Sequence, residues 1–314
     1  MKLAYAIEEY CKHKHAGGRL YVNEKGLLRA FSRTMGDVAA SDVQADAVRQ
    51  FLETLGSTES YRRHSYYVLR GLYRYLIARG LTTVSPVPSV PPKRPPDFHP
   101  HIYSRDELRD LLDATDSYYR CKTQTGLYGR TFRALLLLLY ATGLRIGEAV
   151  ALTLTDVDLR EGLLTIRESK FYKTRLVPVG PALNSVLRDY LNKERPAGLS
   201  RPTAPFLVSR KGSAFTRDTA EKSFRRLRTF TGIHTPGGPR CQPRLHDLRH
   251  TFAVHRLLAW YHAGADVQQL LPQLATYLGH RDLTGTQRYL TMTPEVLRQA
   301  AKRFARYALG GDHE

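Results

Sequence analysis

The chain has 314 residues, 42% of them hydrophobic and 25% charged, which suits two folded domains and excludes a disordered chain. Lysine and arginine outnumber aspartate and glutamate by 48 to 29, and the formal net charge of +19 indicates a polyanionic partner. An ordinary basic surface and an anionic membrane are the alternatives that charge alone leaves open. The longest uninterrupted apolar run, Ala134–Ala141, is far shorter than the roughly 20 residues of a membrane-spanning helix, so it predicts a buried helix and no membrane partner.

The N-terminus and the cysteines indicate where the protein acts. Glu8 and Glu9 interrupt the short apolar patch at the N-terminus, so no signal-peptide core forms. The three cysteines, Cys11, Cys121 and Cys241, form no CxxC pair and fit a reducing compartment. These features predict a cytoplasmic protein. Together with the polyanionic partner that the charge indicates, they fit association with the nucleoid of a prokaryotic cell.

Residues 1–85 predict an all-helical first domain, with helices over 3–14, 23–35, 43–55 and 59–79. Ser41 and Ser57 are the predicted N-caps of the last two helices. In the fourth helix, the face predicted to be buried consists of Tyr61, Ser65, Val68, Leu72 and Leu76. The opposite face consists of Arg63, Tyr67, Arg70 and Arg74. A basic stripe with an interleaved aromatic residue suits a helix that lies on a phosphate backbone, so we predict that these four residues contact DNA; a solvated face is the alternative.

A proline-rich segment separates this domain from the rest of the chain. Seven of the 17 prolines lie between residues 86 and 100. Proline at this density excludes a helix and favours an extended, semi-stiff spacer. We therefore predict a linker over residues 86–100 and a second domain over 101–314. Both domains are net positive, which predicts a two-domain clamp around one polyanion.

The second domain begins with a capping box, Ser104–Glu107, ahead of a helix over 108–113. Further helices are predicted over 131–141, 181–193 and 216–231, and from residue 245 to 308. Two short strands, 162–167 and 175–179, are joined by the hairpin segment 168–174. The predicted fold is therefore mainly α with a small antiparallel β-sheet.

The segment Leu245–Phe252 places polar groups beside a buried helix face. His246 and Arg249 share one side of the helix, whereas Leu248 and Phe252 turn toward a core. His246 and His250 have a spacing found in zinc sites, but the metalloprotease pattern requires glutamate where Asp247 stands. We expect no metal and no cofactor, because the chain also lacks a phosphate-binding Gly-x-x-x-x-Gly-Lys-Ser/Thr loop and a carboxylate cluster for Mg²⁺.

An enzyme that cuts a phosphodiester without metal has three requirements: cationic side chains that stabilise the phosphate, a nucleophile and an acid. Four segments match such an enzyme in order and spacing: ATGLRIGEA from Ala141, SKFYKTRLVPVG from Ser169, LHDLRHTFA from Leu245, and LGHRDLTGTQRY from Leu278 to Tyr289. Together they resemble the signature blocks of tyrosine recombinases, the phage-integrase family. The first domain and the linker resemble that family's core-binding domain, and the second domain resembles its catalytic domain.

The resemblance implies a role for each matching residue. Arg145 and Arg249 would clamp the scissile phosphate, and His246 and His280 would hydrogen-bond it and assist proton transfer. Tyr289 would attack and form a 3′-phosphotyrosine.

In the hairpin, Lys170 would protonate the leaving 5′ hydroxyl, with Lys173 as the alternative. Glu148 would hold the surroundings of the first arginine in place. Lys173 and Arg175 are predicted contacts to the DNA backbone, or solvated side chains. We expect His250 to be a core histidine.

Two segments differ from the family pattern. Phe171 and Tyr172 stand where a glycine-rich turn is common, and Gly285 stands where paired threonines or serines are common. Gly285 is expected to let the tyrosine segment move.

These features predict a site-specific DNA recombinase of a mobile element, acting on a double-stranded recombination site. The helix over 293–308 has an apolar face. The resemblance implies that this helix docks on a neighbouring subunit in a homotetramer on two DNA sites; packing on its own domain is the alternative. A type IB topoisomerase shares the chemistry, and a DNA-binding factor with an inert site shares the charge. Both therefore remain as alternative functions.

Overall fold

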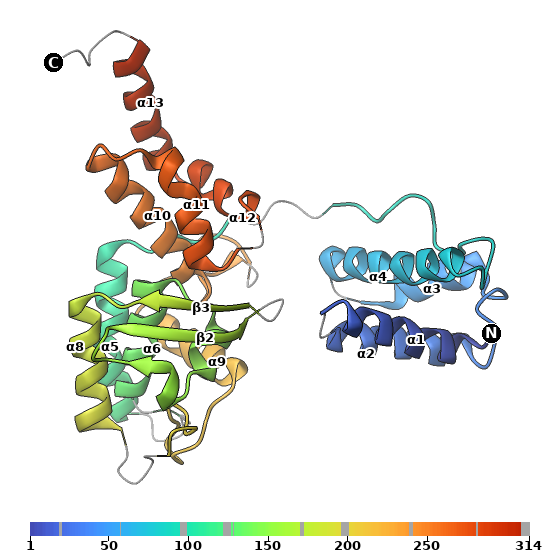
Figure 1. Ribbon diagram of the computed structural model, residues 1–314, viewed down its shortest axis with the longest axis horizontal. Coiled ribbons are helices and arrows are strands. Elements are labelled where there is room, and N and C mark those ends of the chain that lie inside the picture. The colour runs from blue at the N-terminus through green and yellow to red at the C-terminus, as the bar shows by residue number, and fades with distance from the viewer. Residues whose placement is uncertain are drawn as a thin grey trace. The chain divides into compact units, whose positions relative to one another are not determined.

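The computed structural model describes residues 1–18, 21–56, 58–94, 99–121, 127, 129–169, 173–195, 201–238, 241–280 and 282–308. The chain divides into two compact units, Met1–Phe98 and His99–Glu314. Both are built mainly of helices, and the second unit contains a small antiparallel sheet (Figure 1), which confirms the predicted fold class. Within the described residues, no helix is long and apolar enough to cross a membrane.

Four helices form the first unit: α1 (Leu3–Ala16), α2 (Val22–Met35), α3 (Ala45–Thr54) and α4 (Glu59–Ala78). They match the four predicted helices, but the predicted caps differ. Thr58 caps α4 by accepting the backbone N–H of Tyr61. Gln44 precedes α3, so the prediction of Ser41 as its N-cap is wrong. Ser57 lies outside the described residues.

The buried face of α4 contains Ser65, Val68, Leu72 and Leu76, as predicted. Tyr61 was placed on this face, but its side chain is 44% exposed. It lies in the first turn of α4, ahead of the first buried residue, Ser65, so the buried part of this side begins one turn later.

The proline-rich segment begins as part of the first unit. Val87 packs in its core, and the Tyr66 hydroxyl donates a hydrogen bond to the Pro88 carbonyl at 2.9 Å. Apolar and hydrogen-bonding residues among the prolines therefore attach the start of the predicted linker to the first unit. The division between the two units follows Phe98, inside the predicted segment.

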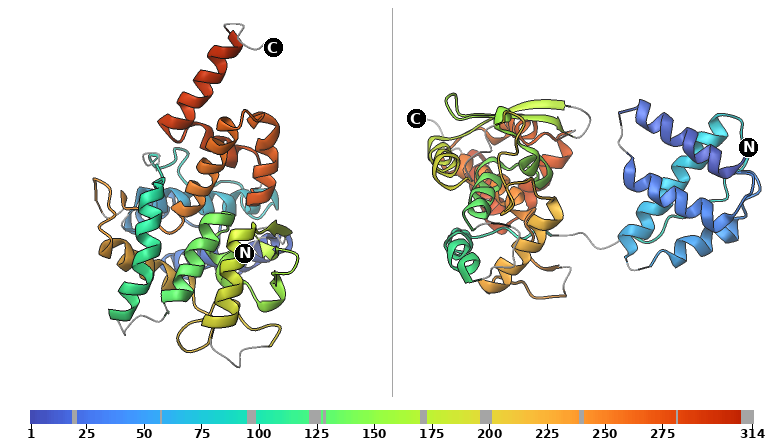
Figure 2. Two further views of the ribbon diagram at one scale, coloured as in Figure 1. Left: turned by 90° about the vertical axis from the view of Figure 1, so that its left-hand side faces the viewer. Right: turned by 90° about the horizontal axis from the view of Figure 1, so that it is seen from below.

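The helices of the second unit follow the predicted order (Figure 2). They are α5 (Arg105–Cys121), α6 (Gly129–Thr142), α7 (Ile146–Ala151), α8 (Pro181–Asp189), α9 (Arg217–Phe230), α10 (Asp247–His262), α11 (Val267–Leu278), α12 (Thr284–Gln287) and α13 (Pro294–Ala308). The predicted capping box starts α5: the Ser104 hydroxyl accepts the backbone N–H of Glu107, and the Glu107 carboxylate accepts that of Ser104. With this start, α5 is longer than the predicted helix.

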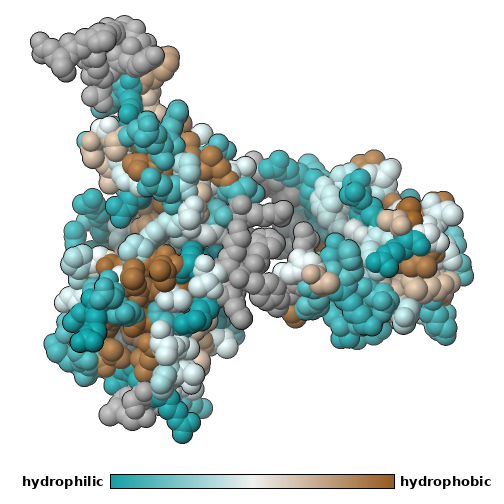
Figure 3. Space-filling view, in the orientation of Figure 1, coloured by the Kyte–Doolittle hydropathy of each residue, from teal (hydrophilic) through white to brown (hydrophobic). Residues whose placement is uncertain are grey.

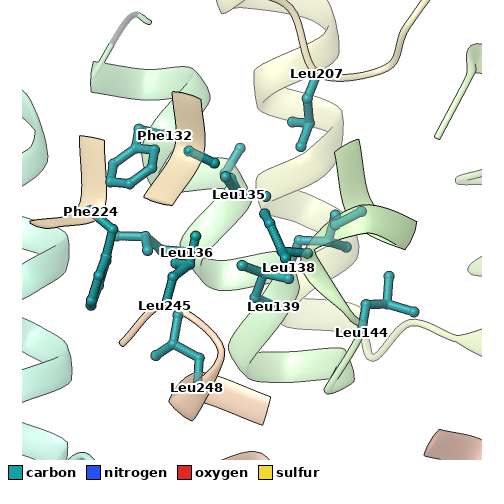
Figure 4. Close-up of a cluster of buried hydrophobic side chains, with 14 of the residues drawn as sticks. Phe132, Leu135, Leu136, Leu138, Leu139, Leu144, Leu207, Phe224, Leu245 and Leu248 are labelled. Atoms are coloured by element: carbon teal, nitrogen blue, oxygen red, sulfur yellow. The ribbon is translucent and has the colours of Figure 1, made fainter. Parts of the chain in front are cut away.

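The leucine-rich helix α6 forms the centre of the second unit. Leu135, Leu136, Leu138 and Leu139 are at most 3% exposed. Side chains from other elements surround them, including Phe224 of α9 (Figure 4). Because α6 is buried on most of its circumference, it supplies a fixed base for the turn that follows it.

The sheet consists of β1 (Val157–Asp158), β2 (Leu163–Ser169) and β3 (Lys173–Pro178) in the order β1-β2-β3, all antiparallel. Leu164 and Val177 pair across β2 and β3, and both are fully buried. The two predicted strands are confirmed, whereas the short β1 was not predicted. On the face seen in Figure 3, hydrophobic side chains gather where the sheet runs in Figure 1.

Candidate active site

Arg145 lies at the start of α7, just after the tight turn that ends α6. In that turn Gly143 has φ +62°, and a Cβ on it would lie 2.5 Å from a ring carbon of Phe252, so the turn requires glycine. The carboxylate of Glu148 accepts the backbone N–H of Arg145 at 3.0 Å and its guanidinium at 2.8 Å. The local sequence therefore fixes both the backbone and the side chain of Arg145.

Arg249, in the first turn of α10, is only 3% exposed. Its guanidinium donates to the carbonyls of Gly143 at 2.7 Å and Leu278 at 2.6 Å. The Arg145 guanidinium donates to the carbonyl of Gly279 at 2.8 Å. The two arginines therefore connect the turn after α6 with the end of α11, although these segments are far apart in the sequence.

His280 follows α11, which Gly279 ends in a left-handed conformation at φ +67°. Nδ1 of His280 lies 2.6 Å from the hydroxyl oxygen of Thr286. A Cβ on Gly285 would lie 3.4 Å from the His280 ring, an ordinary contact distance, so packing does not require glycine here, and its predicted mobility stays a prediction.

Tyr289 lies in the short 3₁₀ helix η4 (Arg288–Thr291) and is 1% exposed. Its ring stacks near that of His280, with 6.2 Å between centroids and 23° between planes. Its hydroxyl oxygen lies 3.2 Å from Nδ1 of His250. The predicted nucleophile is thus enclosed beside the two arginines and two histidines of its own chain.

His246 precedes α10, and its ring lies 5.0 Å from that of His250. Beside it is a cleft of about 980 Å³, whose polar lining includes Arg145, Arg167, Thr174, Arg217 and His246. Three of these side chains are guanidinium groups, and the lining also contains two carboxylates, Glu148 paired with Arg145 and Asp156 paired with Arg167. Arginines outnumber carboxylates in the lining, which suits an anionic backbone. Five of the six predicted catalytic residues therefore lie in one region of the second unit.

The charge balance of this region favours an anionic ligand. Burial and the neighbouring Arg145 lower the pKa of Arg249 to about 10. Burial and nearby arginines lower the pKa of His246 and of His280 to about 4, so both imidazoles are neutral at pH 7. Burial raises the pKa of Tyr289, although the positive charge of Arg249 opposes this. A bound phosphate would offset the positive charge of the buried arginines, so this region is better suited to an anion than to remaining empty.

Glu148 connects the site to Arg175 of β3. Burial opposes ionisation of this carboxyl, but hydrogen bonds from Arg175 and the charges of Arg175 and Arg145 outweigh it and lower the pKa of Glu148 to about 2. Arg175 donates to Glu148 at 2.7 and 3.1 Å, and to the carbonyl of Tyr277 at 3.0 Å. The side chain of Arg175 is only 12% exposed and is paired with Glu148, so the alternative of a solvated side chain is wrong. Its contact with the DNA backbone stays a prediction.

The remaining predicted residues are placed less fully. Lys170 lies outside the described residues, as do Phe171 and Tyr172. Lys173 begins the backbone of β3, and its side chain is not described. Their predicted roles therefore stay predictions.

The predicted DNA-contacting face of α4 is largely open to solvent. Tyr67, Arg70 and Arg74 are exposed. Arg63 is half-buried: it donates to the Pro92 carbonyl and to the Tyr67 hydroxyl, and its guanidinium lies 5.4 Å from the centroid of the Tyr67 ring. Arg70 and Arg74 are thus exposed toward solvent, and the exposed Tyr67 ring is oriented by Arg63.

For three residues of the site, no role was predicted from the sequence. His250 was expected to be a core histidine; it is buried, but it faces the Tyr289 hydroxyl. Thr286 and Arg217 carried no recognisable local signal, because their positions beside His280 and in the cleft depend on the fold.

Across the part of the chain that the structure describes, no group of three His, Cys, Asp or Glu side chains is arranged to hold a metal ion.

A cleft lined by arginines, next to a buried tyrosine, is the arrangement of an enzyme that acts on a phosphodiester through its own side chains. The comparisons with known proteins identify the kind of enzyme. A model of the phage integrase family matches residues 103–295. The putative integrase/recombinase y4rB of Sinorhizobium fredii (strain NBRC 101917 / NGR234) is 34% identical over 96% of this chain and 96% of its own length.

Other matches extend this similarity. Tyrosine recombinase XerD of Mycobacterium tuberculosis (strain ATCC 25618 / H37Rv) is 35% identical over 74% of this chain and 69% of its own length. A lambda integrase dimer bound to a COC′ core site has a similar fold, with a TM-score of 0.67 and 19% identity over 92% of this chain and 95% of that chain. A lambda integrase tetramer bound to a Holliday junction gives a TM-score of 0.65 and 19% identity over 90% and 79%.

The chain therefore belongs to the phage integrase family of tyrosine recombinases. It is a site-specific DNA recombinase, an enzyme that cleaves and rejoins DNA strands. Neither the topoisomerase nor the inert DNA-binding factor gains support from these matches.

Proposed function

We propose that Tyr289 is the nucleophile of this recombinase and that it forms a 3′-phosphotyrosine with a double-stranded recombination site. The observation that carries the proposal is the enclosure of Tyr289 beside Arg249, His250 and His280. The clamp of Arg145 and Arg249 can bind the scissile phosphate while the hydroxyl of Tyr289 attacks the phosphorus. The bond from phosphorus to the 5′ oxygen then breaks, and that oxygen takes a proton from an acid, for which Lys170 is the predicted residue.

This chemistry conserves the energy of the broken bond. The 5′ hydroxyl of another strand attacks the phosphotyrosine, releases Tyr289 and restores a phosphodiester. No nucleotide hydrolysis is therefore needed. We assign the phosphate contacts to Arg145, Arg249, His246 and His280, and contacts to the DNA of the core site to Tyr67, Arg70 and Arg74 of α4.

A nicked suicide duplex tests the nucleophile. The nick lets the short 5′-hydroxyl fragment diffuse away, so cleavage leaves the protein covalently bound to DNA. We expect an adduct with the wild-type chain and none with Tyr289→Phe, while DNA binding survives. The matched control is Tyr277→Phe, which removes the hydroxyl of another half-buried tyrosine and retains the adduct. An adduct of normal yield with Tyr289→Phe would refute the assignment.

A second assay separates recombination from relaxation. With two cognate sites on different plasmids, a recombinase joins strands of one site to strands of the other. A swivelling enzyme changes only the linking number of each plasmid. We expect recombinant junctions that require Tyr289, and relaxation alone would contradict the proposal.

We also propose that the active form is a homotetramer on two DNA sites, joined through α13. Val296 of α13 is fully buried, whereas Leu297 and Phe304 are 47% and 71% exposed. Beyond its first turns, α13 extends away from the rest of the second unit (Figures 1 and 2). An exposed apolar helix face suits docking on another subunit, and the lambda integrase tetramer on a Holliday junction offers a parallel in a protein of similar fold. The cytoplasm, where prokaryotic DNA resides, is the proposed location.

Cooperative DNA binding tests the docking of α13. Phe304→Glu leaves the buried Val296 in place and removes the exposed aromatic side chain. We expect normal binding of one site and loss of cooperative filling of paired sites. The control Lys302→Glu makes the same acidic substitution at an exposed polar position of α13. Unchanged cooperativity in Phe304→Glu would contradict docking through this face.

A further inference from the structure

His250 is a buried histidine that the mechanism above leaves without a role. It follows Arg249 on α10 and is 8% exposed. Its Nδ1 lies 3.2 Å from the hydroxyl oxygen of Tyr289, and the two ring centroids are 5.7 Å apart. Packing in the core alone does not explain why His250 contacts the hydroxyl of Tyr289, the proposed nucleophile.

We propose that Nδ1 of His250 accepts the phenolic proton of Tyr289 as its oxygen attacks the scissile phosphorus, an inference that rests on the proposed role of Tyr289 as nucleophile. In this step the oxygen–phosphorus bond to Tyr289 forms and the bond to the 5′ oxygen breaks. The tyrosine proton moves to His250, which becomes an imidazolium. The departing 5′ oxygen takes its proton from a different group. During rejoining, His250 returns the proton to Tyr289 as the 5′ hydroxyl displaces it.

The surroundings of His250 suit a base that works only when phosphate is bound. The groups that face it are Arg249 on α10, Arg244 and His246 just before α10, and Tyr289 and Arg288 on η4. Burial, His246 and the positive charges of these arginines lower the pKa of His250 to about 3. The imidazole is therefore neutral at pH 7, as a proton acceptor must be.

The same positive charges oppose proton transfer in the free enzyme, because an imidazolium beside Arg249, Arg244 and Arg288 would be repelled. A bound phosphate brings negative charge that offsets this repulsion. Proton transfer to His250 is thereby linked to the presence of DNA, and the tyrosine oxygen loses its proton as it bonds to phosphorus.

His280 is less suited to accept this proton. Its Nδ1 is hydrogen-bonded to Thr286 at 2.6 Å, and its ring lies stacked at 6.2 Å from that of Tyr289. A stacked ring presents its face, and its nitrogens lie in the ring plane. His280 is therefore better placed to contact phosphate, with His250 at the tyrosine hydroxyl.

The first test compares His250→Asn and His250→Phe in single-turnover cleavage of the nicked suicide duplex. Asparagine can still accept a hydrogen bond from Tyr289 but cannot carry the proton, whereas phenylalanine can do neither. We expect both variants to lose about 10²- to 10⁴-fold in the rate of adduct formation, the usual contribution of general base catalysis. DNA binding and melting temperature are measured alongside, and the asparagine variant alone carries the test if the phenylalanine variant unfolds.

His255→Asn is the matched control. His255 lies further along α10, and its Nδ1 contacts the hydroxyl of Tyr140 at 3.0 Å, so it makes the same type of contact with a different tyrosine. We expect its cleavage rate to stay near that of the wild-type chain. A wild-type rate in His250→Asn would overturn the proposal and leave His250 only an orienting role.

A sulfur leaving group separates the base from the acid. A duplex with sulfur in place of the bridging 5′ oxygen releases a thiolate, which needs no protonation. The defect of His250→Asn should persist on this duplex, because the attacking tyrosine still has to lose its proton. Rescue of His250→Asn by sulfur would overturn the proposal, since His250 would then act on the leaving group.

These outcomes are distinguishable from failure of the proposed function. If Tyr289→Phe still forms the adduct, the nucleophile itself is misassigned. If Tyr289→Phe forms none but His250→Asn cleaves at the wild-type rate, only the role of His250 is wrong.

Discussion

Replacing Glu148 with glutamine removes one negative charge and keeps the shape of the side chain. The carboxylate is 8% exposed and binds both Arg145 and Arg175. In Glu148→Gln the guanidinium of Arg175, itself 12% exposed, is left without a counter-charge inside the domain. Breaking a buried ion pair from one side typically costs about 3–5 kcal/mol, because an uncompensated charge remains.

The pKa of Glu148 gives an independent estimate of the same magnitude. Each pH unit of pKa change corresponds to about 1.4 kcal/mol, so lowering the pKa from 4.5 to about 2 stabilises the folded protein by about 3 kcal/mol at pH 7. Since the folded pKa is depressed, this stabilisation is present above pH 4.5 and is lost as the pH falls toward 2. The difference between wild type and Glu148→Gln should therefore shrink over that range.

Urea unfolding followed by tryptophan fluorescence measures this effect in the second unit. Trp260, on α10, is the single tryptophan of the chain and packs beside the core cluster that contains Tyr289. We expect Glu148→Gln to lower the free energy of unfolding at pH 7 by about 3 kcal/mol. Asp218→Asn is the control, because the pair of Asp218 with Lys222 is 69% and 61% exposed and should contribute less than about 1 kcal/mol. A loss below about 1 kcal/mol in Glu148→Gln would refute the reasoning.

Three further predictions follow from the same features. Gly143→Ala should lower the free energy of unfolding in urea by about 2–4 kcal/mol, because a Cβ at φ +62° would lie 2.5 Å from Phe252. Gly147→Ala is the control: a Cβ there meets open space, so urea unfolding should change little. The pKa values of His246, His250 and His280 are about 4, 3 and 4, below the ordinary 6.5, so the unfolded chain binds more protons than the folded chain. The free energy of unfolding should therefore fall as the pH falls from 6.5 toward 4, by up to about 1.4 kcal/mol per pH unit for each histidine. A melting temperature that stays constant between pH 7 and 5 would contradict this. Arg70→Ala and Arg74→Ala should each weaken binding to all DNA sequences and reduce the slope of log affinity against log salt by about one, and an unchanged slope would remove that residue from the DNA contacts.

Regular local patterns predicted the helices and the hairpin strands well. Capping chemistry at Ser104–Glu107 and the leucine run of α6 each depend on neighbours within a few residues, so the sequence contains the whole signal. The proline-rich segment was less predictable. Proline density identified an extended chain, but the attachment of Val87 and Pro88 to α4 depends on a surface that only the folded first unit provides.

The burial of Arg175 could have been predicted from the two-residue period of β3, but its charge led to the prediction of a surface position. It alternates along β3 with the buried Val177, so the two-residue period of a strand places its side chain on the inner face. Its charge suggested the surface instead. A buried arginine requires a partner, and Glu148 lies 27 residues away, at a distance that no local pattern spans.

The active-site residues were likewise predictable only where a local motif contained them. The resemblance to the family predicted five catalytic residues from their positions in the four motifs: Arg145, His246, Arg249, His280 and Tyr289. The structure brings these five residues together. The contact of His250 with Tyr289 joins residues 39 apart in sequence, and it became visible only when α10 and η4 were packed together.

The most direct test of the central claim is to identify the residue that becomes attached to DNA. Trypsin cleaves after Arg288 and Arg298, so Tyr289 lies on a peptide of residues 289–298 that contains no other tyrosine. After digestion of the suicide complex with nuclease and trypsin, we predict a nucleotide mass on Tyr289 of this peptide, with the DNA label retained when it lies 5′ to the cleavage point. A nucleotide on any other peptide, or a label retained only from the 3′ side, would contradict the account.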